Sequence, residues 1–324
     1  MATMTGTPST TAKVRRSHEF HAEAHALSGD LQRPIEQKIE PHVPVALKDE
    51  RGGHLTRFTE DVSIEGLITF KTGHTRVSGS KSLKHHGWVT LSTSVLEGLN
   101  VFEVITADRV VAQVSTEHPY ENGHVPHVTF LGTKFENLQV GGFPLKLNLN
   151  LGVCGEKPKG DKPYLKDLTF LSDIRKQVAS IAKAGFLPER VQKQYDERLT
   201  EIDKLIERNG AWKANGERMK VTCSLVESID IKGIRIPGLE TVGNVLVIPH
   251  FGTVSLGEVE VGIDPTKHSN GFRRHELGAG SSSSNGSSKS SNYFELKMLN
   301  MELGCVGHGN VSASTVKSNG HTYP

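Results

Sequence analysis

Residues 88–116 read WVTLSTSVLEGLNVFEVITADRVVAQVST, and their density of β-branched and aromatic side chains favours extended backbone over helix. This stretch predicts two or three short strands. Residues 63–70 (SIEGLITF) predict a further strand, interrupted by Gly66. Residues 145–153 (LKLNLNLGV) alternate apolar and polar side chains, which is typical of a half-buried strand. The first half of the chain therefore predicts a β body.

The pattern changes to helical spacing between residues 167 and 210. Two apolar stripes recur at intervals of three and four residues, which predicts two amphipathic helices folded as a hairpin. We expect Gly185 to end the first helix in a left-handed conformation, Pro188 to lie in the first turn of the second helix, and Gly210 to end that helix. The stripes consist of Leu171, Ile174, Val178 and Ile181 in the first helix and Val191, Tyr195, Leu199, Ile202 and Ile206 in the second.

Strand patterns resume after the helices, in residues 219–227, 244–263 and 293–305. In the last of these (YFELKMLNMELGC) the alternation slips by one residue between Met298 and Leu299, and such a slip predicts a β-bulge. Because strands flank the helices on both sides, the helical hairpin is predicted to be an insertion in a β domain. The predicted fold is mainly β: a β-sandwich or jelly-roll-like body with an inserted two-helix hairpin. A β-solenoid is the alternative, although no fixed-period repeat supports it.

The same patterns divide the chain into segments. These are a disordered Thr-rich tail (1–16), a first part of the β domain (17–162), the helical hairpin insertion (163–212) and a second part of the β domain (213–324), within which the Ser- and Gly-rich residues 278–292 predict a flexible loop.

The composition places the protein among soluble, nearly neutral chains. The 324 residues are 35% hydrophobic and 23% charged, with a net charge of +2. Nucleic-acid binding usually requires a stronger basic excess. No apolar run is long enough to cross a membrane, and the N-terminal residues lack the apolar core of a secretion signal. We therefore expect a cytoplasmic protein that binds no nucleic acid, with the cell surface or extracellular space, reached by non-standard export, as the alternative location.

The cysteines give no sign of a disulfide framework or a metal site. Cys154, Cys223 and Cys305 are odd in number and widely spaced, and each falls in or beside an apolar alternating segment. This pattern predicts reduced and mostly buried thiols.

The first strand-like segment, residues 16–29 (RSHEFHAEAHALSG), gathers three histidines and two glutamates. A zinc-protease helix requires the spacing His-Glu-x-x-His, and here the position of the second histidine holds alanine. As a strand, the segment places His21, Glu23 and His25 on one face, about 7 Å apart, so an ion would need a third ligand from another strand. We interpret these side chains as a solvent-facing polar row on an edge strand. Throughout residues 18–27 we expect the imidazoles to point to water. The alternative is a metal site that includes His18, His21 and His25.

Residues 155–163 (GEKPKGDKP) have the glycine spacing of a phosphate-binding loop. That motif continues with Lys and then Ser or Thr, whereas this chain has Asp161 and Lys162. An aspartate at this position would repel a phosphate, so we expect a polar turn.

Residues 71–88 form a basic segment without acidic side chains, in which Trp88 is the single aromatic residue available for base stacking. We expect a solvated loop here and a loop position for His124 and His127. The basic residues and histidines of this segment include Lys71, Arg76, Lys81, Lys84, His85 and His86. Since no Gly-x-Ser-x-Gly nucleophile motif occurs either, the sequence predicts no catalytic, cofactor-binding or metal-binding residues and no cofactor.

Five stretches, taken in order, resemble the bacterial choice-of-anchor P family. They are FHAEAHALSGDL (20–31), EVITADRVVAQVST (103–116), TFLGTKFENLQVGGFPL (129–145), IPHFGTVSLGEVEV (248–261) and GNVSASTVKSNG (309–320). The resemblance implies a β-rich structural or surface-associated protein of unassigned function, with no catalytic residues to carry over. The signal peptide typical of that family is absent here, and the helical insertion is a second departure from it.

These observations favour a non-enzymatic structural or protein-interaction protein that self-associates or binds a protein partner. An exposed stripe of the helical hairpin is one expected docking surface. The alternative is a metal-dependent or small-ligand-binding protein of the β-barrel or cupin kind, which would use the clustered histidines.

Overall fold

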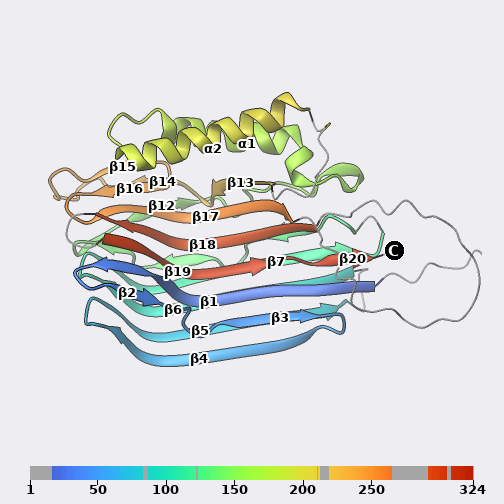
Figure 1. The fold of residues 1–324 in the computed structure, drawn as a ribbon, viewed down its shortest axis with the longest axis horizontal. Helices are drawn as coiled ribbons and strands as arrows, with labels where there is room; N and C mark the ends of the chain where they lie inside the picture. Colours follow the sequence, from blue (N-terminus) through green and yellow to red (C-terminus); the bar gives the residue numbers. More distant parts are fainter. Residues whose placement is uncertain are drawn as a thin grey trace, which may run out of the picture.

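Two antiparallel sheets packed face to face form the body of the protein, and a pair of helices lies along one side (Figure 1). This computed structural model describes residues 17–82, 87–121, 123–209, 211, 219–264, 291–304 and 308–323. The predicted β-sandwich with a helical hairpin is thus confirmed. The predicted disordered tail (1–16) and the predicted loop (278–292, except for its last residues) lie outside the described residues.

The larger sheet joins the first strands of the chain to the last ones. Its central path is β15 (Glu240–Val242), β16 (Val245–Ile248), β17 (Gly252–Asp264), β18 (Ser291–Leu303), β19 (His308–Ser318), β1 (Ser17–Arg33) and β2 (Gln37–Ile39), while β13 (Met219–Ser224) pairs with β17 and both β3 (Val45–Asp49) and β20 (His321–Tyr323) pair with β1. Since β1 has β19 on one side and β3 and β2 on the other, the prediction of an edge strand is wrong.

The smaller sheet is built from consecutive strands between residues 53 and 144. Its path is β11 (Phe143–Pro144), β10 (Gln139–Val140), β7 (Ile105–Pro119), β6 (Gly87–Val101), β5 (Ile68–Lys81) and β4 (Gly53–Ile64), with β8 (His127–Thr129) and β9 (Lys134–Glu136) paired to β7. Residues 88–116 therefore form two long strands rather than several short ones.

Two strand predictions fail at their boundaries. Residues 63–70 are not one strand, because Gly66 adopts φ 68° in the turn that joins β4 to β5. Residues 145–153 contain only the short strand β12 (Lys146–Leu149), which pairs with β14 (Val226–Asp230) in a separate two-stranded sheet. Apolar and polar side chains do alternate in residues 145–153. In the described residues, however, β12 pairs with β14 alone, and turns follow β12 directly.

The interior of the sandwich combines small residues with hydroxyl groups. The inner face of β1 carries Ala22, Ala24 and Ala26, all fully buried. Opposite them, Ser94 Oγ donates a hydrogen bond to the His25 carbonyl oxygen at 2.9 Å, and Ser92 Oγ donates to the Lys317 carbonyl oxygen at 2.7 Å. Serine hydroxyls can lie inside because they find backbone acceptors on the facing sheet. This arrangement explains how a chain with few apolar residues builds a two-layer core.

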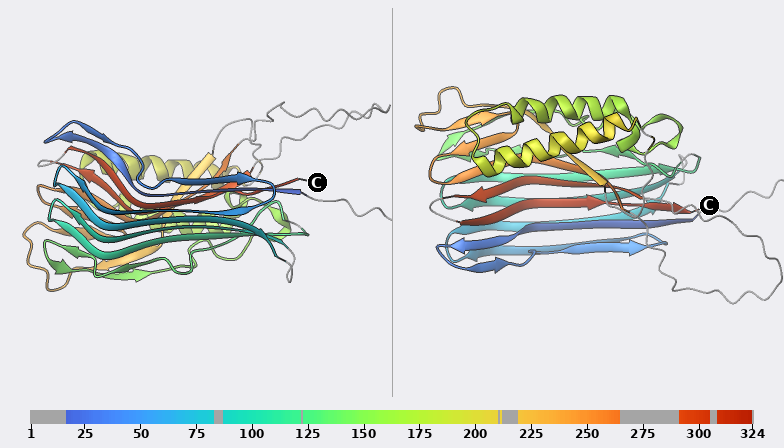
Figure 2. Two further views of the ribbon diagram at one scale, coloured as in Figure 1. Left: turned by 90° about the horizontal axis from the view of Figure 1, so that it is seen from below. Right: turned by 45° about the horizontal axis from the view of Figure 1, so that its top comes forward.

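A transverse crease crosses both sheets, and the strands bend together there (Figure 2). In the larger sheet Lys297 pairs with Thr315 and Leu299 pairs with Ala313, so Met298 lies at the crease with an unchanged register on either side. Met298 and Leu299 are both fully buried, which confirms the slip in the alternation. The predicted β-bulge is wrong, because no residue is inserted. The residues in the crease are Ala26, Ser314, Met298 and Gly257 in the larger sheet and Asp61, Lys71, Gly98 and Asp108 in the smaller one.

Left-handed backbone accounts for the bend. Gly257 (φ 60°) and Gly98 (φ 64°) adopt it, and so do Asp61 (φ 49°) and Ser314 (φ 54°). One residue of positive φ turns the side chains that follow it to the other face of its strand. In each sheet these residues occur on alternate strands: on β17 and β19 in the larger sheet, and on β6 and β4 in the smaller one. The strands between them bend together with these strands.

The helical hairpin consists of α1 (Leu168–Ala182) and α2 (Glu189–Glu207), preceded by the 3-10 turns η1 (Lys159–Asp161) and η2 (Tyr164–Lys166). Asp167 caps the N-terminus of α1, because its carboxylate accepts hydrogen bonds from the backbone N–H groups of Thr169 and Phe170. Pro188 caps α2 instead of lying within its first turn. Gly185 follows the end of α1 without a positive φ, and Gly210 lies outside the described residues.

The hairpin lies against the β body (Figure 2). The side chains of both stripes pack into the core between the helices and the body. The whole first stripe is buried, and Val191, Tyr195 and Ile202 of the second stripe are buried too. Arg198 of α2 forms an ion pair with Glu258 of β17 at 2.9 Å. The expectation that an exposed hairpin stripe docks a partner is therefore wrong, because the body of the same chain covers both stripes.

Candidate functional site

The polar row of β1 faces outward from the middle of the larger sheet. His21 Nε2 lies 2.7 Å from the Glu23 carboxylate, and His25 Nε2 lies 3.0 Å from Ser28 Oγ. The row continues sideways across the sheet, where Glu23 is paired with Lys317. The outward direction of His21, Glu23 and His25 matches the interpretation as a polar face, and each of these side chains is half-buried and engaged by a near neighbour.

His18 points the other way and is buried between the sheets, with 2% of its surface exposed. Its ring stacks on Trp88, with 5.2 Å between centroids, and lies 4.6 Å from the ring of His118, which is fully buried. The expectation that all the imidazoles of the first strand point to water is therefore wrong for His18. The cause is the period of two: His18 shares its face with Phe20, whereas His21 and His25 lie on the opposite face.

The two buried histidines are held as neutral rings. His118 Nδ1 donates to the Gly123 carbonyl oxygen at 2.9 Å, and His18 Nδ1 lies 3.0 Å from Thr322 Oγ1, which itself donates to the same carbonyl oxygen. Burial lowers the pKa of His18 to about 2, helped by the neighbouring His118 and His321, and burial lowers the pKa of His118 to about 4. In the described part of the chain the Nε2 atoms of both rings lack hydrogen-bond partners.

The structure does not bring His18, His21 and His25 together. Across the described ranges, no three His, Cys, Asp or Glu side chains form a group that could hold a metal ion. The histidine cluster of the sequence thus separates into an outward polar row and an inward pair.

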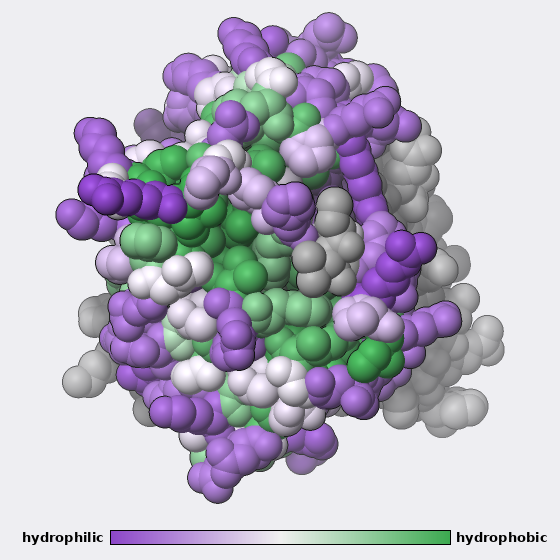
Figure 3. Space-filling view, turned by 90° about the vertical axis from the view of Figure 1, so that its left-hand side faces the viewer, coloured by the Kyte–Doolittle hydropathy of each residue, from purple (hydrophilic) through white to green (hydrophobic). Residues whose placement is uncertain are grey.

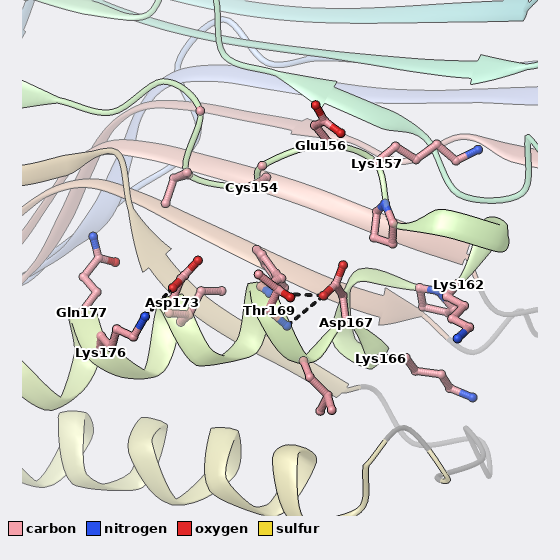
Figure 4. Close-up of a pocket in the computed structure, with 18 of the residues that line it drawn as sticks. Cys154, Glu156, Lys157, Lys162, Lys166, Asp167, Thr169, Asp173, Lys176 and Gln177 are labelled. Atoms are coloured by element: carbon pink, nitrogen blue, oxygen red, sulfur yellow. Dashed lines mark hydrogen bonds and ion pairs between the residues drawn. The ribbon is translucent and has the colours of Figure 1, made fainter.

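A cleft of about 1460 Å³ lies between α1 and the segment that follows β12 (Figure 4). Lysines and carboxylates line it in equal numbers. The lysines are Lys157, Lys159, Lys162, Lys166 and Lys176, and the acidic residues are Glu156, Asp161, Asp167, Asp173 and Glu227. Because the two charges balance, the walls favour neither an anion nor a cation.

The GEKPKGDKP segment forms one wall of this cleft. The Asp161 carboxylate accepts hydrogen bonds from the backbone N–H groups of His124 and Val125, both at 2.9 Å, and pairs with Lys157 at 3.0 Å. Asp161 therefore anchors the segment to the body of the protein. Only a short 3-10 turn interrupts the loop, as expected for a polar turn.

The basic segment 71–88 is not the loop that was expected. Lys71, Arg76 and Lys81 lie in β5, and Trp88 lies in β6. The Lys81 ammonium group lies 5.3 Å from the centre of the Tyr120 ring, a distance at which the ring attracts a cation. Lys84, His85 and His86 lie outside the described residues.

His124 and His127 are both exposed. His124 lies in the loop before β8, as expected, and His127 is the first residue of that strand.

Cys154 and Cys223 are buried, with 4% and 3% of their surfaces exposed, as predicted. Cys305 lies outside the described residues. The neighbouring Cys223 and burial together raise the pKa of the Cys154 thiol well above its usual value.

Apolar side chains gather in a hollow at the end of the sandwich where β7 and β17 begin (Figure 3). Phe102, between β6 and β7, contacts Phe251, between β16 and β17, edge to face with 6.3 Å between ring centroids. This contact joins the two sheets and closes the core between them.

Strand β4 is the exposed edge of the smaller sheet. It is 12 residues long, pairs only with β5 in the described sheet, and every residue before Ile64 is exposed or half-buried. Leu55 is 45% exposed and Phe58 is 56% exposed. A long edge with unpaired backbone groups and apolar side chains is a template for pairing with another strand. Sequence reasoning missed this edge, because sheet order is set by contacts between distant segments.

The comparisons with known proteins bear on the family of the chain. No curated protein and no solved structure matches the chain. Among the helices of the described ranges, none has the length and apolar character to span a bilayer. One family model matches, described as a domain of unknown function, and it covers residues 18–262, well over half of the chain. The chain therefore belongs to the DUF8256 family.

Proposed function

We propose that the protein is a non-enzymatic structural or interaction protein that self-associates through β4. The observation that carries this proposal is the exposed edge: a long strand that, in the part of the chain that the structure describes, pairs on one side only and bears Leu55 and Phe58 in contact with solvent. Pairing of edge strands is an established mode of protein recognition, in which main-chain hydrogen bonds supply affinity.

The two faces of β4 both favour a partner. Phe58 is paired with His74 and lies on the outer face of the sheet, whereas Leu55 is paired with the buried Val77 and lies on the inner face. A strand added beside β4 would shield both side chains from water. Each buried apolar side chain contributes up to about 2 kcal/mol.

The charges of β4 favour a second copy of the same chain. His54 and Arg57 lie in the first half of the strand, and Glu60 and Asp61 lie in the second half. When two copies of β4 run antiparallel, the basic half of each strand faces the acidic half of the other. An antiparallel pair also has the twofold symmetry of most homodimers.

Light scattering coupled to size-exclusion chromatography tests this proposal. The chain has a mass of 35.4 kDa, so we expect the measured mass to rise towards twice that value as the protein concentration increases. A protein that stays monomeric up to high micromolar concentration contradicts the proposal.

A further inference from the structure

His18 of β1 and His118 of β7 bring two imidazole rings together between the sheets, with 4.6 Å between the ring centroids. The uncharged Trp88 of β6 stacks on His18. Strand β20 completes the enclosure, because Thr322 Oγ1 lies 3.0 Å from His18 Nδ1 and donates to the Gly123 carbonyl oxygen. The histidine pair therefore joins β20 to strands of both sheets, at a place that is separate from the β4 edge.

The hydrogen bonds of the pair fix which ring nitrogen carries the proton. Thr322 Oγ1 uses its one hydrogen on the Gly123 carbonyl oxygen, so it accepts from His18 Nδ1. His118 Nδ1 donates to the same carbonyl oxygen at 2.9 Å. Each Nε2 atom is therefore a bare acceptor, and within the described ranges neither of the two has a hydrogen-bond partner.

The main chain at Gly320 covers both bare nitrogens. A Cβ atom added to Gly320 would lie 2.7 Å from His18 Nε2 and 2.7 Å from His118 Nε2, closer than real Cβ atoms approach their neighbours. The carboxylates next to the histidines in sequence, Glu19 and Glu117, point to the opposite faces of their strands because side chains alternate. A proton added at either Nε2 would thus create a buried donor that faces main chain and finds no acceptor.

The other charged groups near the pair do not favour a positive charge on either ring. Asp161 attracts a proton to His118, but Lys157 and His321 oppose it. Asp161 is already paired with Lys157 at 3.0 Å and accepts two backbone hydrogen bonds. His321, in β20 itself, also opposes a charge on His18. Either ring can therefore be hydrated and charged only when the chain from Gly320 onwards moves away.

We propose that the histidine pair makes the docking of β20 sensitive to acid: the neutral rings hold β20 on β1, and their protonation in mild acid releases β20 while both sheets stay folded. Strand β20 suits local release because it has three residues and, in the described chain, pairs only with Ser17–Glu19 of β1. The other strand pairs of β1 do not depend on it. Release frees one side of the first residues of β1, which is then open to another strand.

The expected size of the effect follows from proton uptake. Burial lowers the pKa of both rings in the closed form, whereas a hydrated histidine titrates near pH 6.5. The open form therefore binds more protons, and opening becomes more favourable as the pH falls below 6.5. Between pH 7 and pH 5 each ring should favour opening by about 25-fold, and the two together by several hundredfold.

Native-state hydrogen exchange of the full chain tests the proposal. Exchange is followed by mass spectrometry at pH 7 and pH 5, at several urea concentrations below the unfolding transition, and corrected for intrinsic rates. The reporters are the β20 amides and the Asn319 amide, which donates to the His21 carbonyl oxygen at 2.7 Å. We expect their protection to fall several hundredfold at pH 5 and to depend weakly on urea, because local opening exposes little surface. Amides of β18 should show the strong urea dependence of global unfolding.

Two variants identify the groups responsible. His118→Gln keeps a side-chain donor for the Gly123 carbonyl oxygen and should reduce the change in β20 protection to about 25-fold, whereas the exposed His127→Gln should leave it at several hundredfold. The parent protein decides the matter even if His118→Gln does not fold. Protection of β20 that is equal at both pH values would overturn the proposal. So would a urea dependence in β20 as strong as in β18, since β20 would then be released only when the whole protein unfolds.

Discussion

Leu55 on β4 and Val77 on β5 are directly paired and share the inner face of the smaller sheet, yet Val77 is fully buried and Leu55 is 45% exposed. The facing sheet therefore covers β5 more completely than β4, although its strand β3 contacts both. Phe58 is exposed on the outer face of the same strand. An edge that carries an exposed apolar side chain on each face, and that has no strand on its outer side among the described residues, is the physical basis for the proposed self-association.

Charged substitutions on β4 should prevent this association. Phe58→Lys, at a site with a side chain already in water, is expected to shift the monomer–dimer equilibrium at least tenfold towards monomer, because pairing would bury the new charge. Leu131→Lys is the matched control, since Leu131 is 67% exposed and lies outside β4. Sedimentation velocity measures both variants, and equal weakening by the two would contradict a specific role for β4.

The buried histidine pair should make the free energy of unfolding fall as the solution becomes more acidic. In the unfolded chain a histidine titrates near pH 6.5, whereas the folded protein holds His18 and His118 neutral down to about pH 4 or below. The unfolded state therefore binds more protons as the pH falls, and the stability present above pH 6.5 is lost progressively below it. Between pH 7 and pH 5 the free energy of unfolding should fall by roughly 2 kcal/mol for each of the two rings.

Urea unfolding at several pH values measures this dependence. The variant His118→Gln should show about half of the loss attributed to the pair, whereas the exposed His127→Gln should leave the slope unchanged. A His118→Gln protein with the same pH dependence as the parent would show that the buried ring does not carry the effect.

The ion pair between Arg198 and Glu258 should matter far more than the exposed pairs. Burial opposes ionisation of Glu258, but Arg198 and a hydrogen bond from Asn300 outweigh it and hold its pKa below the usual value. Arg198→Met would leave that carboxylate buried without its cation and should cost about 3 kcal/mol. Lys176 and Asp173 form an exposed ion pair, and Lys176→Met should lower the free energy of unfolding by less than about 0.5 kcal/mol. Equal losses in chemical denaturation would argue against this view of the α2 interface.

The crease of the sheets should be sensitive to side chains at its left-handed positions. Gly257 has φ 60°, and a Cβ there would lie 3.3 Å from Val226 Cγ2. Gly257→Ala should therefore destabilise the protein by at least about 1 kcal/mol. Gly185→Ala is the matched control, because a Cβ at Gly185 meets nothing within 4 Å and the backbone there has no positive φ. A neutral Gly257→Ala variant in urea unfolding would refute the assigned role of the left-handed residue.

Local patterns were sufficient to predict the fold class and the helices. The stripe from Leu171 to Ile181 is buried as the periodicity predicts, and the slip between Met298 and Leu299 marks a real change of face. The slip could not reveal its cause, because the crease is a property of neighbouring strands that bend together without a change of register. The same limit applies to Gly66, which the local pattern places within a strand and the structure places in a turn.

The sites depend on contacts between distant segments, and single-sequence patterns do not report these. His18 of β1 meets His118 of β7 across the sandwich, although 100 positions separate them in the sequence. The position of β1 in the middle of a sheet follows from its pairing with β19, from the far end of the chain. Resemblance to the choice-of-anchor P family and a cytoplasmic location stay predictions.

Hydrogen exchange of the β4 backbone amides, followed by mass spectrometry at low and high protein concentration, tests the central claim most directly. In a monomer the amides on the free side of β4 are open to water and exchange fast. We predict that exchange in residues 53–64 slows as the concentration rises, while the exposed loop around Leu131 exchanges at a constant rate. Exchange in β4 that is independent of concentration, in a sample whose mass shows that it has associated, would contradict pairing through this edge.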